Sequence, residues 1–232
     1  YSPVTAEYGG TVESVAGWLE LKRTNESGEL YYQDYVNGIY GIDGGLEFSF
    51  KKSSSDVGFE VITMGGGYTV YTKWDNDGKL YAKYRDSDAA LTNDSYRYIC
   101  DIEGTEAKIT FYLYQTERAY SIAVNDKMVS KLLYSQTKNA AKNELFRINV
   151  LTGNIGDTVS VDYKKTGAFS AHALNFDSAS VDTSKANTEN TIDITARFIG
   201  QSTAASSDLN IYNAVYDSTN KLVAVSALPV SG

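Results

Sequence analysis

Apolar and polar residues alternate in short runs along most of the first 165 positions, and turn-forming residues separate the runs. In the run 44–52, Leu46, Phe48 and Phe50 occupy every second position. Side chains of a strand point alternately to its two faces, so each run predicts a strand with one buried and one wet face. About a dozen such strands, spaced by about ten residues and without a convincing helix, predict an antiparallel β-sandwich or jelly roll.

The stretch 65–85 shows the pattern most clearly and predicts a hairpin. The turn is assigned to 75–78, Asp-Asn-Asp-Gly, because these residue types tolerate the backbone conformations of a tight turn. A calcium loop is the alternative interpretation of the same residues, but the further ligands of such a loop are missing from the sequence. The side chains expected to face inward are Tyr68, Val70, Thr72, Trp74, Leu80, Ala82 and Tyr84, and those expected outward are Thr69, Tyr71, Lys73, Tyr81, Lys83 and Arg85.

The composition changes near Gly167, because seventeen of the nineteen tyrosines precede it. Residues 165–173 are predicted to form a linker, and four further strands are predicted at 174–181, 191–199, 208–217 and 221–230. Four strands are fewer than the seven or so of an immunoglobulin domain. We therefore expect a large β-domain at 1–168 and a small, incomplete immunoglobulin-like β-domain at 174–232.

The charge balance and the single cysteine narrow the possible partners. A net charge of −8 with a pI near 4.7 disfavours nucleic acid and anionic membrane surfaces. Cys100 has no partner for an intrachain disulfide, and its phase with Tyr98 and Ile102 predicts a buried, unreactive thiol. No run reaches the 18 or so apolar residues of a membrane span, and no signal peptide is recognised. Because the chain does not begin with Met, we expect a piece of a larger multimodular protein.

Two stretches resemble the concanavalin A-like jelly rolls of secreted polysaccharide-degrading proteins. One is 109–129, a strand pair with Asn125-Asp126-Lys127 at its tip, and the other is 146–166, which begins with the strand of Arg147 and ends with that of Asp162. The tail 212–232 resembles the immunoglobulin-like modules of clostridial and ruminococcal surface and cellulosomal proteins. These resemblances imply an extracellular, bacterial location. They also imply one structural calcium, with Glu7 and Asp162 as candidate ligands.

The residue types of known sugar-cleaving sites do not come together in the sequence. Retaining glycosidases need two carboxylates about 5 Å apart, which this fold provides through an E-x-D-x-x-E strand motif. The sequence has no such string, and Glu20, Glu47 and Glu60 are isolated on alternating strands, as expected of solvated face residues. His172 is the single histidine and lies in the expected linker, so neither a histidine base nor a catalytic triad is indicated. We expect no catalytic residue and no enzyme activity, although carboxylates or a Tyr/Arg pair from separate strands could still converge.

Aromatic residues recur on the polar faces of the predicted strands. Sugar rings pack their C–H faces on aromatic rings, and their hydroxyls need polar partners. If neighbouring strands carry these residues, they cover one sheet face; the alternative is that they form ordinary cross-strand pairs or lie beneath the second domain. The predicted carbohydrate-binding residues are Trp18, Tyr71, Tyr81, Tyr112, Tyr114, Arg85, Arg97, Arg147 and Asn149.

The leading hypothesis is a non-catalytic carbohydrate-binding module of a plant-cell-wall-degrading protein. Its ligand would be a β-glucan or a hemicellulose such as xyloglucan, and its role would be to hold a linked enzyme near that polysaccharide. A polysaccharide lyase or glycoside hydrolase of jelly-roll fold is the second hypothesis. A structural or adhesive module without a sugar ligand is the third.

Overall fold

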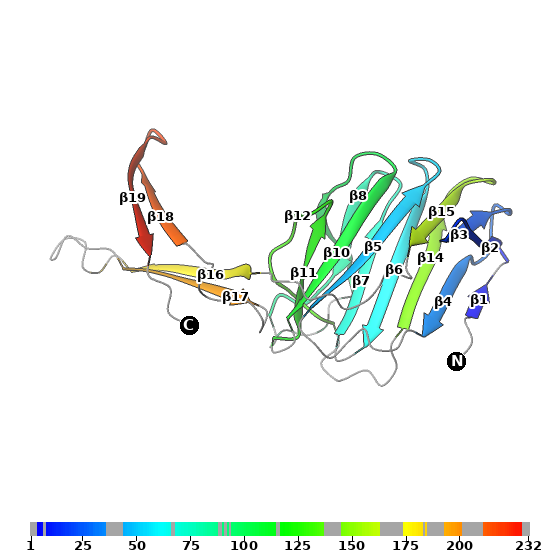
Figure 1. Cartoon of the computed structure of the whole chain (residues 1–232), viewed down its shortest axis with the longest axis horizontal. Helices are drawn as coiled ribbons and strands as arrows, with labels where there is room; N and C mark the ends of the chain where they lie inside the picture. Colours follow the sequence, from blue (N-terminus) through cyan, green and yellow to red (C-terminus); the bar gives the residue numbers. More distant parts are fainter. Residues whose placement is uncertain are drawn as a thin grey trace.

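The computed structural model describes residues 4–6, 8–35, 44–65, 68–87, 90, 92, 94–114, 117–136, 145–162, 174–182, 184, 193–200 and 211–228. Every regular element among them is a β-strand, and all strand pairs are antiparallel. The described strands between residues 4 and 162 form two sheets packed face to face, a jelly-roll β-sandwich (Figure 1). No helix able to cross a membrane occurs in the described ranges.

The first sheet, called sheet A, has seven strands in the spatial order β1-β4-β14-β6-β7-β8-β9. Strands distant in the sequence are neighbours in it, since β14 lies between β4 and β6. The bounds are β1 Val4–Ala6, β4 Tyr31–Tyr35, β6 Gly58–Gly65, β7 Tyr68–Trp74, β8 Lys79–Lys83, β9 Arg97–Asp101 and β14 Leu145–Thr152.

The second sheet, called sheet B, has eight strands in the order β12-β11-β10-β5-β15-β3-β2, with β13 also paired to β11. Its bounds are β2 Gly10–Val15, β3 Trp18–Arg23, β5 Gly44–Lys52, β10 Glu106–Tyr114, β11 Ala119–Val124, β12 Lys127–Met128, β13 Leu133–Tyr134 and β15 Thr158–Asp162.

Aromatic and aliphatic side chains from the inner faces of both sheets form one core. The Phe48 ring of sheet B stacks on the Phe146 ring of sheet A at 5.3 Å between centroids. The Phe50 ring contacts Phe59 at 5.1 Å, and Phe59 meets Trp74 at 5.8 Å. Burial of these rings, each removed almost entirely from water, is the main stabilising term of the sandwich. The alternation seen in the sequence therefore corresponds to the inner and outer faces of the two sheets.

The turns follow their residue types. Asp75 opens the loop between β7 and β8, and its carboxylate accepts the amides of Asp77 at 3.0 Å and Lys79 at 2.9 Å. Gly78 takes the positive φ of 76° that ends this loop. The predicted hairpin is confirmed. Asn125 and Asp126, at φ 49° and 65°, form the predicted second hairpin turn between β11 and β12.

A β-bulge in β9 changes the expected phase around Cys100. Leu80 lies opposite Cys100, whereas Tyr81 lies opposite Tyr98, so Ile99 is an extra residue in the strand. The bulge turns Tyr98 outward while Cys100 packs against the core. The shared phase that the sequence suggested for these two residues is therefore wrong, and the thiol is half-buried rather than fully buried. Burial and the nearby Asp101 raise the pKa of Cys100 to about 11, which keeps the thiol protonated at neutral pH.

All four strands predicted after the linker are present as two hairpins. The first pairs β16 Leu174–Asp182 with β17 Asp193–Gly200, and the second pairs β18 Ile211–Tyr216 with β19 Leu222–Leu228. Each is a separate two-stranded sheet. The turn 217–220, Asp-Ser-Thr-Asn, closes the second hairpin, and the Asp217 amide donates to the Lys221 carbonyl at 3.0 Å. The assignment of this region as an immunoglobulin-like domain, and its boundary at 165–173, stay predictions.

Candidate functional site

The outer face of sheet A carries a continuous row of facing residues from β4 to β9. Strand register places Tyr31, Asn149, Glu60, Lys73, Tyr81 and Tyr98 opposite one another in that order. A second row, one pleat away, consists of Gln33, Arg147, Ile62, Tyr71 and Lys83. The side chain of Tyr96, just before β9, contacts residues of both rows. We call these residues together the tyrosine face.

Glu60 is the polar centre of the tyrosine face. One carboxylate oxygen accepts the hydroxyl of Tyr96, and the other accepts the side-chain amide of Asn149 at 2.8 Å. The Asn149 carbonyl oxygen in turn accepts Arg147 Nε at 2.7 Å. The chain of bonds therefore crosses from β14 through β6 to the segment before β9, and it fixes four side chains on one surface.

Three cations of this face lie over tyrosine rings. Lys73 Nζ is 4.6 Å from the Tyr81 ring centre, and Lys83 Nζ is 4.7 Å from that of Tyr96. At the other end of the face, the Arg147 guanidinium lies 3.9 Å from the Tyr31 ring. Such contacts are cation–π interactions, and they hold long side chains along the aromatic surface. Tyr81 also meets Tyr98 edge to face, at 6.1 Å between centroids.

The electrostatics of the tyrosine face oppose proton abstraction by a tyrosine. Burial and the Glu60 carboxylate, to which its hydroxyl is bonded, raise the pKa of Tyr96 above its ordinary range. Burial, Glu60 and Asp94 raise the pKa of Tyr71 as well. A tyrosine that acts as a base needs the opposite shift. Glu60 is the single carboxylate of the two rows, all of whose members are described, whereas glycosidases use a pair.

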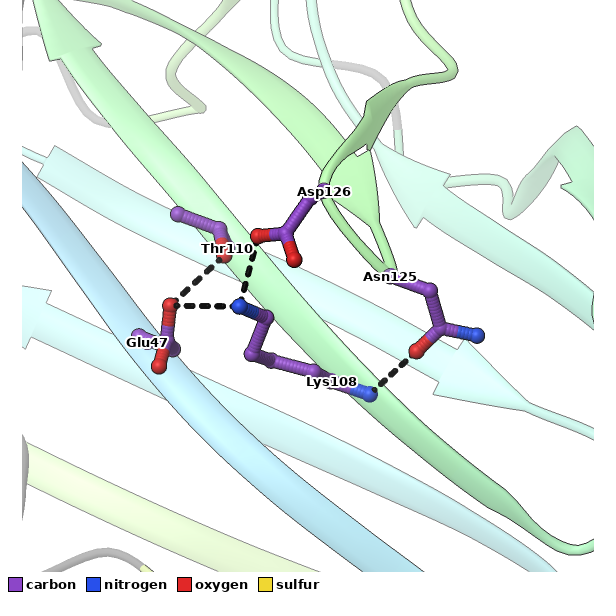
Figure 2. Close-up of polar contacts among 5 residues, drawn as sticks. All are labelled: Glu47, Lys108, Thr110, Asn125 and Asp126. Carbon is purple, nitrogen blue, oxygen red and sulfur yellow. Dashed lines mark hydrogen bonds and ion pairs between the residues drawn. The ribbon is translucent and has the colours of Figure 1, made fainter.

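The outer face of sheet B is also polar, and the charges around Lys108 are paired with one another (Figure 2). Lys108 on β10 extends its ammonium group between Asp126, at 2.5 Å, and Glu47 on β5, at 3.5 Å. Asn125 accepts the Lys108 backbone amide at 2.9 Å. We call the set Glu47, Lys51, Glu106, Lys108 and Asp126 the ion-pair face.

Trp18 lies on sheet B and belongs to this second surface. The Lys51 ammonium lies 4.8 Å from the Trp18 ring and 3.6 Å from Glu106. Trp18 borders an open hollow of about 360 Å³ that Lys108 and Asn125 also line. The ring is therefore a separate candidate contact and does not extend the tyrosine face.

The structure corrects two of the predicted tyrosines. Tyr114 is fully buried, and its hydroxyl lies 3.1 Å from the Ser121 hydroxyl. It packs with Ala119 and Leu132 beneath the segment that follows β12, so it cannot form a surface platform. Tyr112 is half-buried against the same cluster and is part of sheet B. The expectation that Tyr112 and Tyr114 share one sheet face with Tyr71 and Tyr81 is wrong.

Two of the predicted arginines have internal partners. Arg85 is 1% exposed, and its guanidinium donates to the carbonyls of Ser135 at 2.6 Å, Ser87 at 3.1 Å and Ala90 at 3.3 Å. The expected outward orientation of Arg85 is wrong, because its guanidinium bonds the Ser135 carbonyl, and Arg85 and Tyr134 form an isolated β-bridge beyond the end of β8. Arg97 forms an ion pair with Asp86 at 2.7 Å, and its guanidinium lies 3.5 Å from the Tyr84 ring, away from Tyr98.

The remaining predictions have mixed outcomes. Tyr71, Tyr81, Arg147 and Asn149 do come together on the tyrosine face. Asp162 lies at the end of β15, opposite Ser49, and Glu7 is outside the described residues, as is His172. Within the described part of the chain, no group of three or more potential ligands could hold a metal ion. The calcium site therefore stays a prediction.

Sequence reasoning missed Tyr31, Tyr96 and Tyr98 as members of the site. The segment 31–35, Tyr-Tyr-Gln-Asp-Tyr, shows no clear alternation, and nothing local indicates that it lies beside β14. The bulge at Ile99 brings Tyr98 next to Tyr81, and bulges have no reliable sequence signal. The signal that was available for Tyr96 is its neighbourhood, since Tyr96, Arg97 and Tyr98 follow a polar loop.

Comparison with known proteins gives remote structural similarity only. No protein-family model matches the chain, and no curated protein does. A transglycosylase solved in complex with NAG, Crh5, superposes with a TM-score of 0.46 and 13% identity over 69% of this chain and 83% of that one. A lichenase from a mouse hindgut metagenome gives 0.44 and 11% over 69% and 91%, and the carbohydrate-binding module CBM66 from Bacillus subtilis gives 0.38 and 11% over 68% and 91%. The fold assignment itself rests on the sheet topology of this chain.

Proposed function

We propose that this chain binds a polysaccharide along the tyrosine face without cleaving it. The observation that carries the proposal is the row from Tyr31 to Tyr98, which spans the strands β4 to β9. Neighbouring strands lie about 4.8 Å apart, so the row is about 24 Å long and gives room for several sugar units of an extended chain. The ligand class is a plant cell-wall polysaccharide, a β-glucan or a hemicellulose such as xyloglucan.

The chemistry of the face suits sugars. The rings of Tyr31, Tyr71, Tyr81 and Tyr98 offer surfaces for the C–H faces of pyranose rings. Between them, the side chains of Asn149, Arg147 and Gln33 offer donors and acceptors for hydroxyl groups. Because Glu60 and Asn149 are held by hydrogen bonds before any ligand arrives, little side-chain entropy is lost on binding.

The role follows from binding without cleavage. In this proposal the chain is an extracellular, bacterial module that keeps a linked enzyme close to its polysaccharide. It needs no cofactor, because stacking and hydrogen bonding supply the affinity.

Catalysis is the second candidate, and one contact favours it. The hydrogen bond between Tyr96 and Glu60 joins a phenol and a carboxylate beside Arg147, the residue types of a lyase site. The raised pKa of Tyr96 speaks against its action as a base.

A panel of plant polysaccharides tests these possibilities together. Affinity electrophoresis should show retardation of the intact chain by at least one β-linked polysaccharide, with no release of reducing ends or unsaturated uronates on long incubation. Release of either product would establish the enzyme instead. Unretarded migration in every gel would leave a structural or adhesive module as the function.

A further inference from the structure

Among the residues that the structure describes, the cations of the tyrosine face have no carboxylate partner. Lys73 and Lys83 lie over tyrosine rings. An ion pair needs a nitrogen–oxygen distance of 4.0 Å or less, and no carboxylate oxygen of the described residues lies that close to either ammonium group or to the Arg147 guanidinium. Tyrosine rings attract a cation but do not neutralise it. Three positive charges are therefore presented on one side of an acidic protein.

Glu60 lies opposite Lys73 but forms its hydrogen bonds with other residues. Strand register places Glu60 directly opposite Lys73, the usual geometry of a cross-strand ion pair. The two carboxylate oxygens instead accept hydrogen bonds from Tyr96 and Asn149. Two further carboxylates act on this surface from exposed positions: Asp94 on the pKa of Tyr71 and Asp101 on that of Tyr98. The Lys73 ammonium keeps its donors for a group outside the protein.

We propose that the ligand of the tyrosine face is an acidic polysaccharide whose sugars carry uronate carboxylates. Its sugar rings pack on Tyr71 and Tyr81, and its carboxylates pair with Lys73, Lys83 and Arg147. The proposal rests on the proposed function, and it selects the acidic hemicelluloses over neutral chains such as xyloglucan. Arg147 favours carboxylates in particular, because the planar guanidinium fork matches a carboxylate through two parallel hydrogen bonds.

Non-specific attraction does not explain such a preference. The chain carries a net charge of −8, so a polyanion is repelled by the protein as a whole. Binding of an acidic chain therefore requires that local pairing outweigh this repulsion. The ion-pair face has cations too, but Lys108 is already neutralised by Glu47 and Asp126 (Figure 2).

The test compares one polymer before and after a single chemical change. A xylan with uronate side groups is prepared in its native form and after reduction of the carboxyl groups, so that the two ligands differ only in charge. The intact chain should bind the native polymer about tenfold more tightly than the reduced one, as expected of three ion pairs at the modest strength of exposed pairs. A sulfated polysaccharide of similar charge density serves as a third ligand and should bind more weakly than the uronate polymer.

Substitutions of lysines on the two faces test which cations cause the preference for the native polymer. Lys73→Gln with Lys83→Gln should lower affinity for the native polymer several-fold more than affinity for the reduced polymer, so that the preference for the native polymer shrinks, whereas Lys73→Arg with Lys83→Arg should retain the preference. Lys108→Gln is the matched control on sheet B and should change neither. Thermal unfolding of each variant confirms that it is folded, and the arginine variant keeps the test valid if the glutamine variant is unstable.

Each other outcome has a defined meaning. Equal binding of native and reduced polymer would overturn the acidic-ligand proposal and leave the proposed function intact. Stronger binding of the sulfated polymer would overturn it as well. No binding of any of the polymers, nor of neutral glucans, would overturn the proposed function itself.

Discussion

The outer faces of the two sheets contain similar residues but use their charges differently. On sheet B, Lys108 reaches Asp126 and Glu47, and Lys51 reaches Glu106, so these two cations are paired within the protein. On sheet A, Lys73 and Lys83 lie over tyrosine rings. Glu60 accepts its hydrogen bonds from Tyr96 and Asn149 and not from these lysines. The difference teaches that the composition of a face does not identify a binding surface. We propose that the internal pairing of charged groups distinguishes the two faces.

Substitution of Arg85 should have the largest effect on stability. Its comparison with Arg147 distinguishes a buried arginine from one on the tyrosine face. Arg85→Ala should lower the free energy of unfolding by about 3 kcal/mol, because the carbonyls of Ser135, Ser87 and Ala90 lose a charged, buried donor. Chemical denaturation measures this change. Arg147→Ala, on the tyrosine face, should cost less than about 1 kcal/mol. Equal stability of the two variants would show that the buried hydrogen bonds of Arg85 do not stabilise the fold.

Loss of stacking rings should come next in size. Tyr71→Ala and Tyr81→Ala should each weaken polysaccharide retention by about 1–3 kcal/mol, by analogy with bases stacked on aromatic side chains, while thermal unfolding changes little. Affinity electrophoresis gives the comparison, with Trp18→Ala as the control on sheet B. If Trp18→Ala were the weaker binder and the tyrosine variants bound normally, the assignment of the two faces would be reversed.

Much of the sandwich was predictable, because alternation in a strand is a local property. Val70, Trp74, Leu80 and Ala82 were all expected to face inward, and all are buried. The partition of strands between two sheets is not local. Tyr112 and Tyr81 are equivalent by pattern, yet they lie on different sheets.

The candidate site was predictable only in part for the same reason. The sequence indicated Tyr71 and Tyr81 through one hairpin. It could not indicate that β13 would pair with the strand end at Arg85, or that a bulge at Ile99 would turn Tyr98 toward Tyr81. These features depend on contacts made after the chain has folded.

Alkaline pH should act on the tyrosine face. The pKa of Tyr96 is raised by burial and by Glu60, so the unfolded chain loses this proton at the ordinary tyrosine pKa of about 10 while the folded chain keeps it. The stability that Tyr96 contributes is thus complete below about pH 10 and is lost as the pH rises above it. Thermal unfolding at about pH 9 and 11 should show a smaller alkaline loss for Tyr96→Phe than for the parent chain. An equal loss would mean that Tyr96 is not perturbed.

The smallest effect is expected on the ion-pair face. Lys108→Ala should lower the free energy of unfolding by less than about 1 kcal/mol, since the side chains of its partners Glu47 and Asp126 are 38% and 74% exposed to solvent. Denaturation and polysaccharide retention are measured side by side, and retention should be unchanged. A clear loss of retention would place sheet B in the binding surface.

The most direct measurement is hydroxyl-radical footprinting of the intact chain with and without a saturating polysaccharide. The tyrosine face predicts that oxidation of Tyr81 and Tyr98 falls strongly on binding, while oxidation of Trp18 on sheet B stays constant. Protection of Trp18 with unchanged oxidation of Tyr81 and Tyr98 would contradict the central claim.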